Sequence, residues 1–462
     1  MITATDARAM DANSEHLGVS VGSLMDNAGR SISDYLKKNH PDSKIVFVCG
    51  TGNNGGDGFA AALGMNPEMV KVALLKKPSS IRTAISRERY SVLECPIEMY
   101  TSESLEGFDV IVDCALGTGI SGTVRDPYLS YIRDVNESDS IVISADVPSG
   151  FGTDVMVKPD VTITFHDVKE GMESCDCGKI VVADIGIPPE AVELVGPGDM
   201  VRYPIPGNES HKGNNGRLMV VGGGPYFGAP VMSSLSALRC GTDIVRIFTP
   251  ESISDIVSMT NPVLMVTPLP GKDLGMESVD MLLDESKNYD AVLIGPGLGR
   301  SQRTMDAVRR FISECATPMV IDADAISVAA NMTFHTPVVF TPHSREFSSI
   351  AGDSSPETVA SDMNAIILKK GSEDIITDGT RTRRNRTGNP SMTGAGTGDV
   401  LSGAVAGLLS KGMSAFDAAC LGAFICGSAG DLSFSCKSYG SIATDIIECI
   451  PDILREHLDG SD

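Results

Sequence analysis

The sequence contains no tryptophan, and aromatic residues make up only 5% of its 462 positions. Basic residues are also scarce, because 37 Lys and Arg stand against 60 Asp and Glu and give a net charge of −23. Nucleic acids and anionic membranes are held by clustered Lys and Arg. The charge balance therefore argues against both as partners. One basic run, at Arg381, Arg383, Arg384 and Arg386, predicts an exposed hairpin rather than a nucleic-acid patch.

Paired C-x-x-C motifs are missing, although the chain has 11 cysteines, so a zinc site is not expected. Cys175 and Cys177 lie two apart, and we interpret all the cysteines as reduced thiols. The start, MITATDARAM, lacks the basic and apolar regions of a signal peptide. No run reaches the roughly 18 uninterrupted apolar residues of a membrane span. We therefore expect a cytoplasmic protein without a membrane-spanning segment.

The length exceeds what one hydrophobic core usually serves, so two or three domains are expected. Short β-branched runs such as KIVFVC at 44–49 alternate with helical patterns, which predicts a largely parallel sheet covered on both faces. A Pro-, Gly- and Asn-rich stretch at 196–216 interrupts this rhythm, which restarts with RLMVVGGG at 217–224. The fold class is therefore α/β, with two domains over residues 1–205 and 206–462.

Three loops follow strand candidates in the first domain: GTGNNGGDG at 50–58, DCALGTGISG at 113–122 and DVPSG at 146–150. Strand ends of a parallel sheet meet at one edge, so Asn54, Asp57, Asp113, Asp146 and Ser149 are expected to converge there. The glycine cluster before a helix suits a phosphate group, although its spacing is not G-x-G-x-x-G. The oxygen side chains suit an alkali or alkaline-earth cation. Asp57 and Asp146 are candidates for acid–base catalysis.

Together with LMDNAG at 24–29, these loops resemble the NAD(P)H-hydrate epimerase domain, also called the YjeF N-terminal domain, over roughly residues 1–200. That resemblance implies a Rossmann-like three-layer parallel sheet. It implies interconversion of the R and S forms of NADH or NADPH hydrated on the nicotinamide ring, with Asp146 as the catalytic base. It also implies a potassium ion held by Asn54, Asp113 and Ser149. The substrate contacts it implies, besides Asp146, are Asn53, Asn54, Gly55, Gly56, Asp57, Gly117, Thr118, Gly119, Ile120, Ser121, Gly122 and Thr123.

The second domain carries the motif GNPSMTGAGTGDVL at 388–401, in which a Gly-rich turn opens a helix. Amides at such a helix start neutralise an anion, and Asp399 in the first turn can take a proton from an alcohol while a phosphoryl group is transferred. No Walker lysine pattern occurs, which excludes the P-loop class. Further loops that end strand candidates are GPGLG at 295–299, DADA at 322–325, TPHSRE at 341–346 and KKG at 369–371. The segment His211–Gly213 is expected either to close over the phosphates or to serve as a linker.

These motifs resemble the ribokinase-like superfamily, and within it the NAD(P)H-hydrate dehydratase branch, over residues 211–403. The resemblance implies a ribokinase-like α/β sandwich. Asp399 would act as the base in phosphorylating the ring hydroxyl, and elimination of phosphate would then restore NAD(P)H. Mg²⁺ with ADP is implied as the donor, giving AMP and phosphate. Contacts to the hydrated ring are implied for Ala229, Gly299, His343 and Asp399, and nucleotide contacts for Lys370, Gly371, Ser372, Glu373, Asp374 and Gly398. Arg345 and Ala395 depart from the usual pattern.

The two resemblances predict a bifunctional enzyme that repairs hydrated NADH and NADPH, epimerising both forms and dehydrating the S epimer. The alternative is a thiazole- or pyrimidine-type kinase fused to a nucleotide-binding accessory domain. GTGD alone does not separate the two, whereas GNPSM, TPHSRE and the upstream NNGGD loop favour repair. A third possibility treats the N-terminal half as a binding module without catalysis. A homo-oligomer is expected, because ribokinase-like domains often assemble by symmetry.

Overall fold

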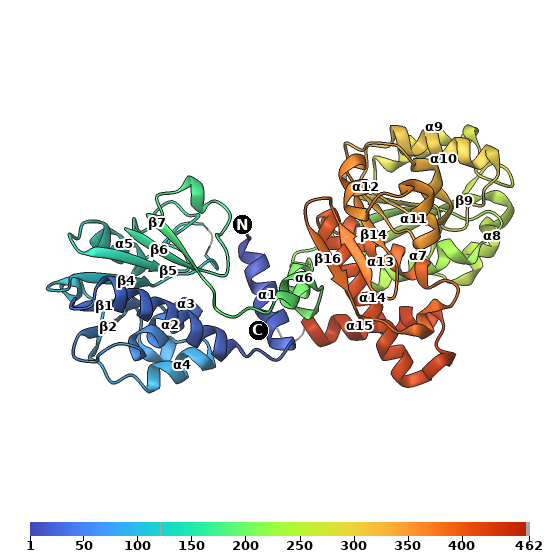
Figure 1. Ribbon diagram of the computed structural model, residues 1–462. Coiled ribbons are helices and arrows are strands. Elements are labelled where there is room, and N and C mark those ends of the chain that lie inside the picture. Colours follow the sequence, from blue (N-terminus) through green and yellow to red (C-terminus); the bar gives the residue numbers. More distant parts are fainter. Residues whose placement is uncertain (121, 459–462) are drawn as a thin grey trace. The chain divides into compact units, whose positions relative to one another are not determined.

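The computed structural model describes residues 1–120 and 122–458, and it divides into two compact units, Met1–Ala191 and Val192–Asp462 (Figure 1). The expected boundary lay later, at residue 205. The residues between 192 and 205 join the second unit because Val195 and Met200 are buried in its core. In addition, the Val195 amide donates to the Arg384 carbonyl at 2.9 Å. Each unit is an α/β sandwich, which confirms the expected fold class.

The N-terminal unit is built on a seven-stranded parallel sheet in the order β3-β2-β1-β4-β5-β6-β7. Helices cover both faces, with α2, α3 and α4 over one core and α5 over the other. The strands are β1 (Ile45–Cys49), β2 (Val70–Leu74), β3 (Ile97–Met99), β4 (Val110–Cys114), β5 (Ile141–Ala145), β6 (Val161–Phe165) and β7 (Lys179–Ala183). The helices are α1 (Ala4–His16), α2 (Val21–Asn39), α3 (Asn53–Leu63), α4 (Ala84–Ser91), α5 (Tyr128–Asn136) and α6 (Pro189–Glu193).

Within this sheet, the edge strands β3 and β7 are the two that sequence periodicity does not predict. Both are largely exposed or half-buried, so they lack the continuous apolar run of a central strand. At the centre of the sheet, β1 and β4 lie side by side, with Cys49 opposite Cys114. Strand order reverses between these two strands, and ligands of open α/β sheets bind at that switch point. The loops after β1 and β4 therefore open onto the natural binding edge.

The C-terminal unit has a nine-stranded sheet in the order β10-β9-β8-β11-β12-β13-β14-β15-β16, parallel up to β14 and antiparallel beyond it. One face carries α7, α13, α14 and α15, and the other carries α9, α10, α11 and α12. The strands are β8 (Arg217–Val221), β9 (Ile244–Pro250), β10 (Met265–Leu269), β11 (Ala291–Ile294), β12 (Met319–Ile321), β13 (Val338–Phe340), β14 (Ile366–Lys369), β15 (Asp374–Thr377) and β16 (Thr382–Asn385). The helices are α7 (Gly228–Arg239), α8 (Glu251–Thr260), α9 (Val279–Ser286), α10 (Gln302–Glu314), α11 (Ser344–Ala351), α12 (Pro356–Met363), α13 (Thr397–Ser410), α14 (Ala415–Lys437) and α15 (Ala443–Leu458).

The segment around α14 is long and apolar enough to cross a membrane, and it is the only such segment among the described residues. Its most apolar stretch is 67% buried inside the unit. Phe416, Leu421 and Ile425 on this helix belong to the core that α13 and α15 share. The apolar character of α14 is thus that of a central core helix.

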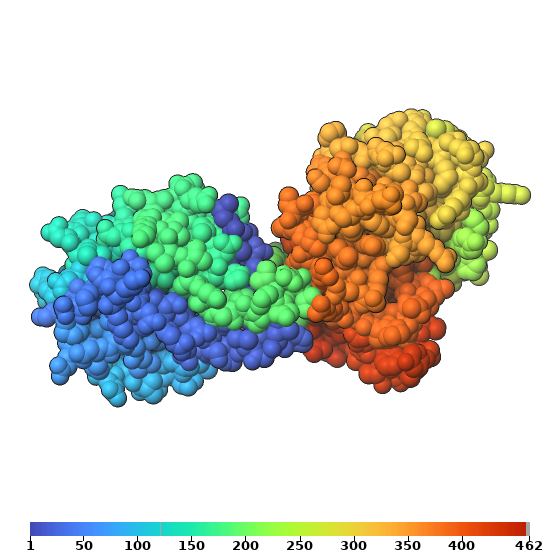
Figure 2. Space-filling model, in the orientation of Figure 1, coloured from blue at the N-terminus to red at the C-terminus, as the bar shows by residue number. Residues whose placement is uncertain are grey.

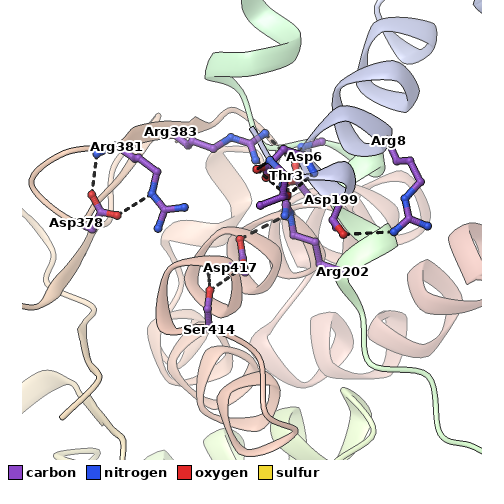
Figure 3. Close-up of polar contacts among 12 residues, drawn as sticks. Thr3, Asp6, Arg8, Asp199, Arg202, Asp378, Arg381, Arg383, Ser414 and Asp417 are labelled. Atoms are coloured by element: carbon purple, nitrogen blue, oxygen red, sulfur yellow. Dashed lines mark hydrogen bonds and ion pairs between the residues drawn. The ribbon is translucent and has the colours of Figure 1, made fainter. Parts of the chain in front are cut away.

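The basic run lies on the β15–β16 hairpin, but it is not uniformly exposed. Arg383 is largely buried and pairs with Asp199, which has no exposed surface and also contacts Arg202 (Figure 3). Arg384 and Arg386 instead pair with Glu373 at the surface. The expectation of a fully exposed hairpin was therefore wrong at Arg383, because a buried carboxylate needs a charged partner.

Candidate active sites

A cavity of about 440 Å³ opens at the carboxyl edge of the N-terminal sheet, and we call it the N-terminal cavity. The loops after β1 and β4 approach each other closely at this cavity because residue 50 is glycine. A Cβ at Gly50 would lie 1.9 Å from the Ala115 carbonyl oxygen. The space-filling view shows the surface of this unit in blue and green (Figure 2). The polar residues that line the cavity include Arg8, Asp11, Asn53, Asn54, Asp57, Arg82, Thr118, Asp146, His166 and Lys169.

The structure brings most of the predicted epimerase residues to this cavity. Asn53, Asn54, Asp57, Gly117, Thr118, Gly119, Ile120 and Asp146 all line it. Gly122 and Thr123 are not lining residues, and Ser121 lies outside the described residues. Gly55 and Gly56 are buried behind the cavity wall, where Cβ atoms would lie 2.2 Å from the Gly50 carbonyl oxygen and 2.3 Å from the Ser86 hydroxyl. Gly55 thus lets α3 pack closely against the loop after β1, and Gly56 lets it pack closely against Ser86 of α4.

Asp113, at the end of β4, is fully buried beneath the cavity. Its carboxylate accepts hydrogen bonds from the Tyr131 hydroxyl at 3.0 Å, from the Ser144 hydroxyl at 2.8 Å, and from both the amide and the hydroxyl of Ser149. Burial raises the pKa of Asp113, and these hydrogen bonds act against that rise. The Ser149 hydroxyl in turn accepts from the Leu116 amide at 2.8 Å. Asp113 and Ser149 therefore tie the loops after β4 and β5 together.

Asn54 has one unsatisfied atom. Its side chain is only 8% exposed, and its Nδ2 donates to the Leu116 carbonyl at 3.0 Å. Its Oδ1 has no hydrogen-bond partner among the described residues. Buried acceptors are nearly always satisfied in folded proteins. An oxygen left open at the wall of a cavity indicates that a ligand completes it.

Asp146 follows β5 in a left-handed backbone conformation, with φ at 62°, and its amide donates to the Ile163 carbonyl at 2.8 Å. One carboxylate oxygen, Oδ1, is paired with the ammonium group of Lys169. The buried Lys169 also donates to the Thr164 hydroxyl at 3.1 Å and to the Phe165 carbonyl at 2.8 Å. All three ammonium donors are thus used. The other oxygen of Asp146 accepts no hydrogen bond from the described residues and is left for a ligand.

Sequence reasoning missed Lys169 and Asp11. Lys169 lies four residues beyond β6, so the rule that ligands gather at strand ends would have found it. Asp11 lies on α1, ahead of the first strand, where that rule gives no signal. Burial, and then the charge of Asp146, raises the pKa of Asp11 to about 6, while Lys169 lowers it. Burial, followed by the charges of Asp146 and Asp11, also raises the pKa of Asp57.

In the C-terminal unit, Asp399 lies in the first turn of α13, three residues after Gly396, the N-cap residue with a φ of 91°. Burial raises the pKa of Asp399 to about 7, and the nearby charges of Asp322, Asp324 and Glu346 add to the rise while Lys370 opposes it. We call these five residues the C-terminal cluster. Asp322 and Asp324 follow β12, Glu346 follows β13 and Lys370 follows β14, so the sheet gathers these four at its carboxyl edge, where the start of α13 adds Asp399.

Lys370 connects two parts of this cluster. Its ammonium lies 3.1 Å from Asp322, a carboxylate only 2% exposed that also accepts from the Thr341 hydroxyl at 2.7 Å. A Cβ at Gly398 would lie 3.2 Å from the same ammonium nitrogen. The start of α13 thus approaches Lys370 closely. A helix N-terminus and an ammonium group together favour a bound anion.

The other predicted dehydratase residues lie on neighbouring loops. His343 caps α11, its Nδ1 accepting from the amides of Arg345 and Glu346, and its side chain is half exposed. The Gly299 amide donates to Asp324 at 2.9 Å. Ala229 lies in the first turn of α7, 3.3 Å from where a Cβ of Gly297 would stand. Arg345 and Ala395, the two departures, are both exposed.

The predicted nucleotide segment forms the turn between β14 and β15. The Gly371 amide donates to Asp374 at 3.0 Å, and Asp374 accepts from Asn385 at 3.0 Å. Ser372 is exposed. The Glu373 carboxylate is held by Arg384 and Arg386, which lower its pKa. This turn lies beside Lys370 and therefore at the same edge as Asp399.

The segment His211–Gly213 does not reach this edge. The Gly213 amide donates at 2.8 Å to Asp243, which directly precedes β9. Gly213 also shares a shallow cavity with Asp290, Pro318 and Pro337, which precede β11, β12 and β13. These positions mark the amino edge of the sheet, opposite the C-terminal cluster. The expected closure of this segment over the phosphates is therefore wrong, and the segment lies within the second unit rather than between the two units.

Sequence models of two families match the chain. Residues 21–171 match the family described as YjeF-related protein N-terminus, and residues 218–452 match NAD(P)H-hydrate dehydratase. Among solved structures, the C-terminal unit is similar to an ADP/ATP-dependent NAD(P)H-hydrate dehydratase from Bacillus subtilis, with a TM-score of 0.50, 22% identity, and coverage of 58% of this chain and 99% of that chain. A ribokinase-like superfamily protein from Enterococcus faecalis has a TM-score of 0.51 and 23% identity, over 57% of this chain and 96% of that chain. These two structures show a shared fold.

Relatives of known name extend over both units. The chain is 36% identical over 466 residues to the bifunctional NAD(P)H-hydrate repair enzyme of Archaeoglobus fulgidus, and the match covers 98% of each chain. It is 38% identical to the enzyme of the same name from Methanothermobacter thermautotrophicus, covering 97% of this chain and 94% of the relative. The identity is spread over the whole length, so the fused kinase alternative is not favoured. The chain therefore belongs to the family of bifunctional NAD(P)H-hydrate repair enzymes.

Proposed function

We propose that this chain repairs hydrated NADH and NADPH with two separate sites. The N-terminal cavity interconverts the R and S epimers, and the C-terminal cluster dehydrates the S epimer. The observation that carries the proposal is that each unit of this family member holds an aspartate at the ligand-binding edge of its sheet, Asp146 beside Lys169 and Asp399 at the start of α13. Accordingly, Asp146 and Asp399 are the proposed catalytic residues.

In the N-terminal cavity, the proposed substrate contacts are the lining residues of the loops after β1 and β4, with Arg8 and Arg82 available for the phosphates. A potassium ion fits beside Asn54, because its Oδ1 is a buried oxygen without a donor. Oxygen ligands of this kind are what hard cations prefer. Asp113 and Ser149 would complete the potassium site. The ion would supply positive charge close to the substrate phosphates.

At the C-terminal cluster, the proposed reaction has two steps. Asp399 takes the proton of the ring hydroxyl while the oxygen attacks the β-phosphorus of ADP, and the bond from that phosphorus to AMP breaks. Phosphate then leaves the ring with the C–O electron pair, and loss of a proton from the neighbouring carbon restores the double bond. Lys370, Gly398 and the turn from Gly371 to Asp374 would hold the nucleotide.

Magnesium would arrive with the nucleotide. The described residues contain no cluster of three or more His, Cys, Asp or Glu that would hold a metal alone. Mg²⁺ commonly keeps several waters and binds through one or two carboxylates and the substrate phosphates. Asp322 and Asp324 are the carboxylates of the cluster that would contact the ion. When bound, the ion would neutralise charge on the phosphates. The Bacillus protein was crystallised with ATP and Mg²⁺, so both ADP and ATP should be compared as donors.

The central test uses purified protein with each epimer of hydrated NADH. With ADP and Mg²⁺, dihydropyridine absorbance should return for both epimers, and AMP and phosphate should appear in equal amounts. Recovery of neither epimer, together with phosphorylation of a thiazole or pyrimidine alcohol, would overturn the proposal. Omitting K⁺ should slow only epimer exchange.

Two variants separate the sites. Asp399→Asn should abolish dehydration and leave epimer exchange intact, because the C-terminal cluster loses its base. Asp146→Asn should slow exchange and leave dehydration of the S epimer unchanged. Loss of both activities in either folded variant would contradict the assignment of one reaction to each unit.

We further propose that the enzyme is a cytoplasmic homo-oligomer. All 11 cysteines are free thiols, and eight of them are buried, which suits a reducing compartment. On and after α8, the apolar side chains of Ile256, Met259 and Val263 are exposed, which gives a candidate self-association surface. Light scattering should therefore find more than one chain per particle. A concentration-independent monomer would refute the oligomer.

A further inference from the structure

Four charged side chains from four separate segments meet in the N-terminal cavity. Asp11 comes from α1, Asp57 from α3, Asp146 from the loop after β5, and Lys169 from the loop after β6. No one sequence motif contains all four residues. Only the tertiary structure makes them one site, and Lys169 pairs with just one of the three carboxylates.

Helix α1 is fastened to the segment that carries Lys169. The Ile2 amide donates to the Val168 carbonyl at 2.9 Å, and the Glu170 amide donates to the Ile2 carbonyl at 2.9 Å. Ile2 itself is buried and lines the cavity. These bonds flank Lys169, so α1 and its Asp11 are held in a fixed place relative to the Lys169–Asp146 pair.

The three carboxylates differ in their partners. One oxygen of Asp146 is paired with the ammonium group of Lys169, and the other accepts no hydrogen bond from the described residues. Asp11 has no hydrogen-bond or ion-pair partner among the described residues, although it is partly buried and lines the cavity. Burial, and then the charge of Asp146, raises the pKa of Asp11 to about 6, so Asp11 keeps its proton to a higher pH than an exposed carboxyl group does. Two carboxyl groups whose environments differ in this way can divide the acid and base roles of one reaction.

We infer that Asp11 is the general acid of epimer exchange and that Lys169 positions Asp146 as the general base. This inference rests on the proposed epimerase function. Asp11 is a catalytic residue in this scheme, because it protonates the departing hydroxyl group. Lys169 is a positioning residue, because all its donors are used within the protein and it acts through Asp146.

The chemistry balances without a co-reactant other than water. Hydration of an enamine places the hydroxyl group on the carbon next to the ring nitrogen. The C–O bond breaks with its electron pair, the oxygen takes the proton of Asp11 and leaves as water, and the nitrogen lone pair forms a C=N⁺ bond. Water then adds to the other face of that carbon, the C=N⁺ electron pair returns to nitrogen, and Asp146 takes the proton of the added water. Proton exchange with solvent resets both carboxyl groups.

A pH dependence follows from the groups that face Asp11. These are Arg8 on its own helix, Asp57 of α3, and Arg82, Asp146, His166 and Lys169 from the surrounding loops. Asp11 loses its proton as the pH rises through about 6. Because a general acid works only when protonated, kcat for exchange should fall as the pH rises above that value. Burial, followed by the charges of Asp146 and Asp11, also raises the pKa of Asp57, while Lys169 lowers it.

The test compares Asp11→Asn with Glu15→Gln, a change of an exposed acidic residue on the next turn of the same helix. Exchange of the R into the S epimer is followed by chromatography, after subtraction of the uncatalysed rate. Asp11→Asn should lower kcat for exchange by roughly 100-fold or more, with little change in KM, and should remove the decline above pH 6. Glu15→Gln should behave as wild type. Dehydration of the S epimer by each variant shows whether the C-terminal unit is still active.

Lys169 is tested with Lys169→Arg and Lys169→Met. Arg should retain part of the exchange rate, because it keeps a charge beside Asp146, whereas Met should lose it and alter the acidic side of the pH profile. If Asp11→Asn exchanges epimers within threefold of wild type, or keeps the wild-type pH profile, the role of Asp11 is overturned. Should that variant not fold, a wild-type rate that stays constant between pH 5 and 8 overturns it equally. If the wild type itself exchanges no epimers, the proposed function fails instead.

Discussion

Replacing Asp399 with asparagine should stabilise the C-terminal unit while destroying its activity. Burial and the neighbouring carboxylates raise the pKa of Asp399 from 3.8 to about 7. Folding therefore favours the protonated form, and its stabilising effect is complete below pH 4 and lost as the pH rises through 7. At pH 8 the wild type must hold an ionised carboxylate in an unfavourable place. Asparagine has the same shape and no charge, so it avoids this cost.

The size of the effect follows from the shift in pKa. Each pKa unit corresponds to about 1.4 kcal/mol, so a rise from 3.8 to about 7 sets a ceiling of roughly 4 kcal/mol at pH 8. Water screens a partly exposed carboxylate, so we expect Asp399→Asn to raise the free energy of unfolding by about 2–3 kcal/mol at pH 8 and by less than half of that at pH 5. For a unit of this size, each kcal/mol raises Tm by about 2–4 °C. The melting temperature should therefore rise by roughly 5–10 °C at pH 8.

Calorimetry at pH 5 and pH 8 measures this difference, with the transition of each unit followed separately. Asp353→Asn, at an exposed position in the same unit, is the matched control and should change Tm by little at either pH. The dehydration rate of the wild type should rise with pH through about 7, as Asp399 ionises and becomes a base. An Asp399→Asn protein no more stable than wild type at pH 8, or stabilised equally at both pH values, would refute the reasoning.

Three further changes test the packing beneath the sites. Gly55→Ala should destabilise the N-terminal unit and slow epimer exchange, because its Cβ would lie 2.2 Å from the Gly50 carbonyl oxygen, whereas Gly52→Ala, with open space around it, should melt like wild type. Asp113→Ala should lower the free energy of unfolding by about 3 kcal/mol or more in a denaturant titration, since it strands several buried donors; a loss below 1 kcal/mol would contradict this. Lys370→Met should weaken nucleotide binding in calorimetric titrations and leave the buried Asp322 without its charge partner, and unchanged ADP affinity would remove Lys370 from the site.

The order of motifs was enough to predict much of the two sites. Central strands such as β1 and β4 are continuous apolar runs, and the polar loops after them mark ligand-binding edges by a general rule of parallel sheets. Asp146 could be named for that reason, and Asp399 because a glycine-rich turn opens the helix that carries it. The edge strands β3 and β7 escaped prediction because they are exposed and carry mixed residues. One of the two sequence-based interpretations of residues 211–213 placed them at the wrong edge of the C-terminal sheet. Sequence order alone does not show which end of the next strand a loop contacts.

Local sequence by itself determined the α/β class, the two domains, the glycine-rich loops and the acidic residue at the end of each key strand, because these features depend on spacing along the chain. The tertiary structure decided which groups share a site. Asp11 lies far from Asp146 in sequence. Lys169 contacts Asp146 only because β5 and β6 run parallel and end at the same edge of the sheet. Charge state was decided in the same way, since the difference between a carboxylate paired with an ammonium group and one buried near other carboxylates depends on distance and burial in space. The acid and base roles of the aspartates are therefore properties of the folded chain.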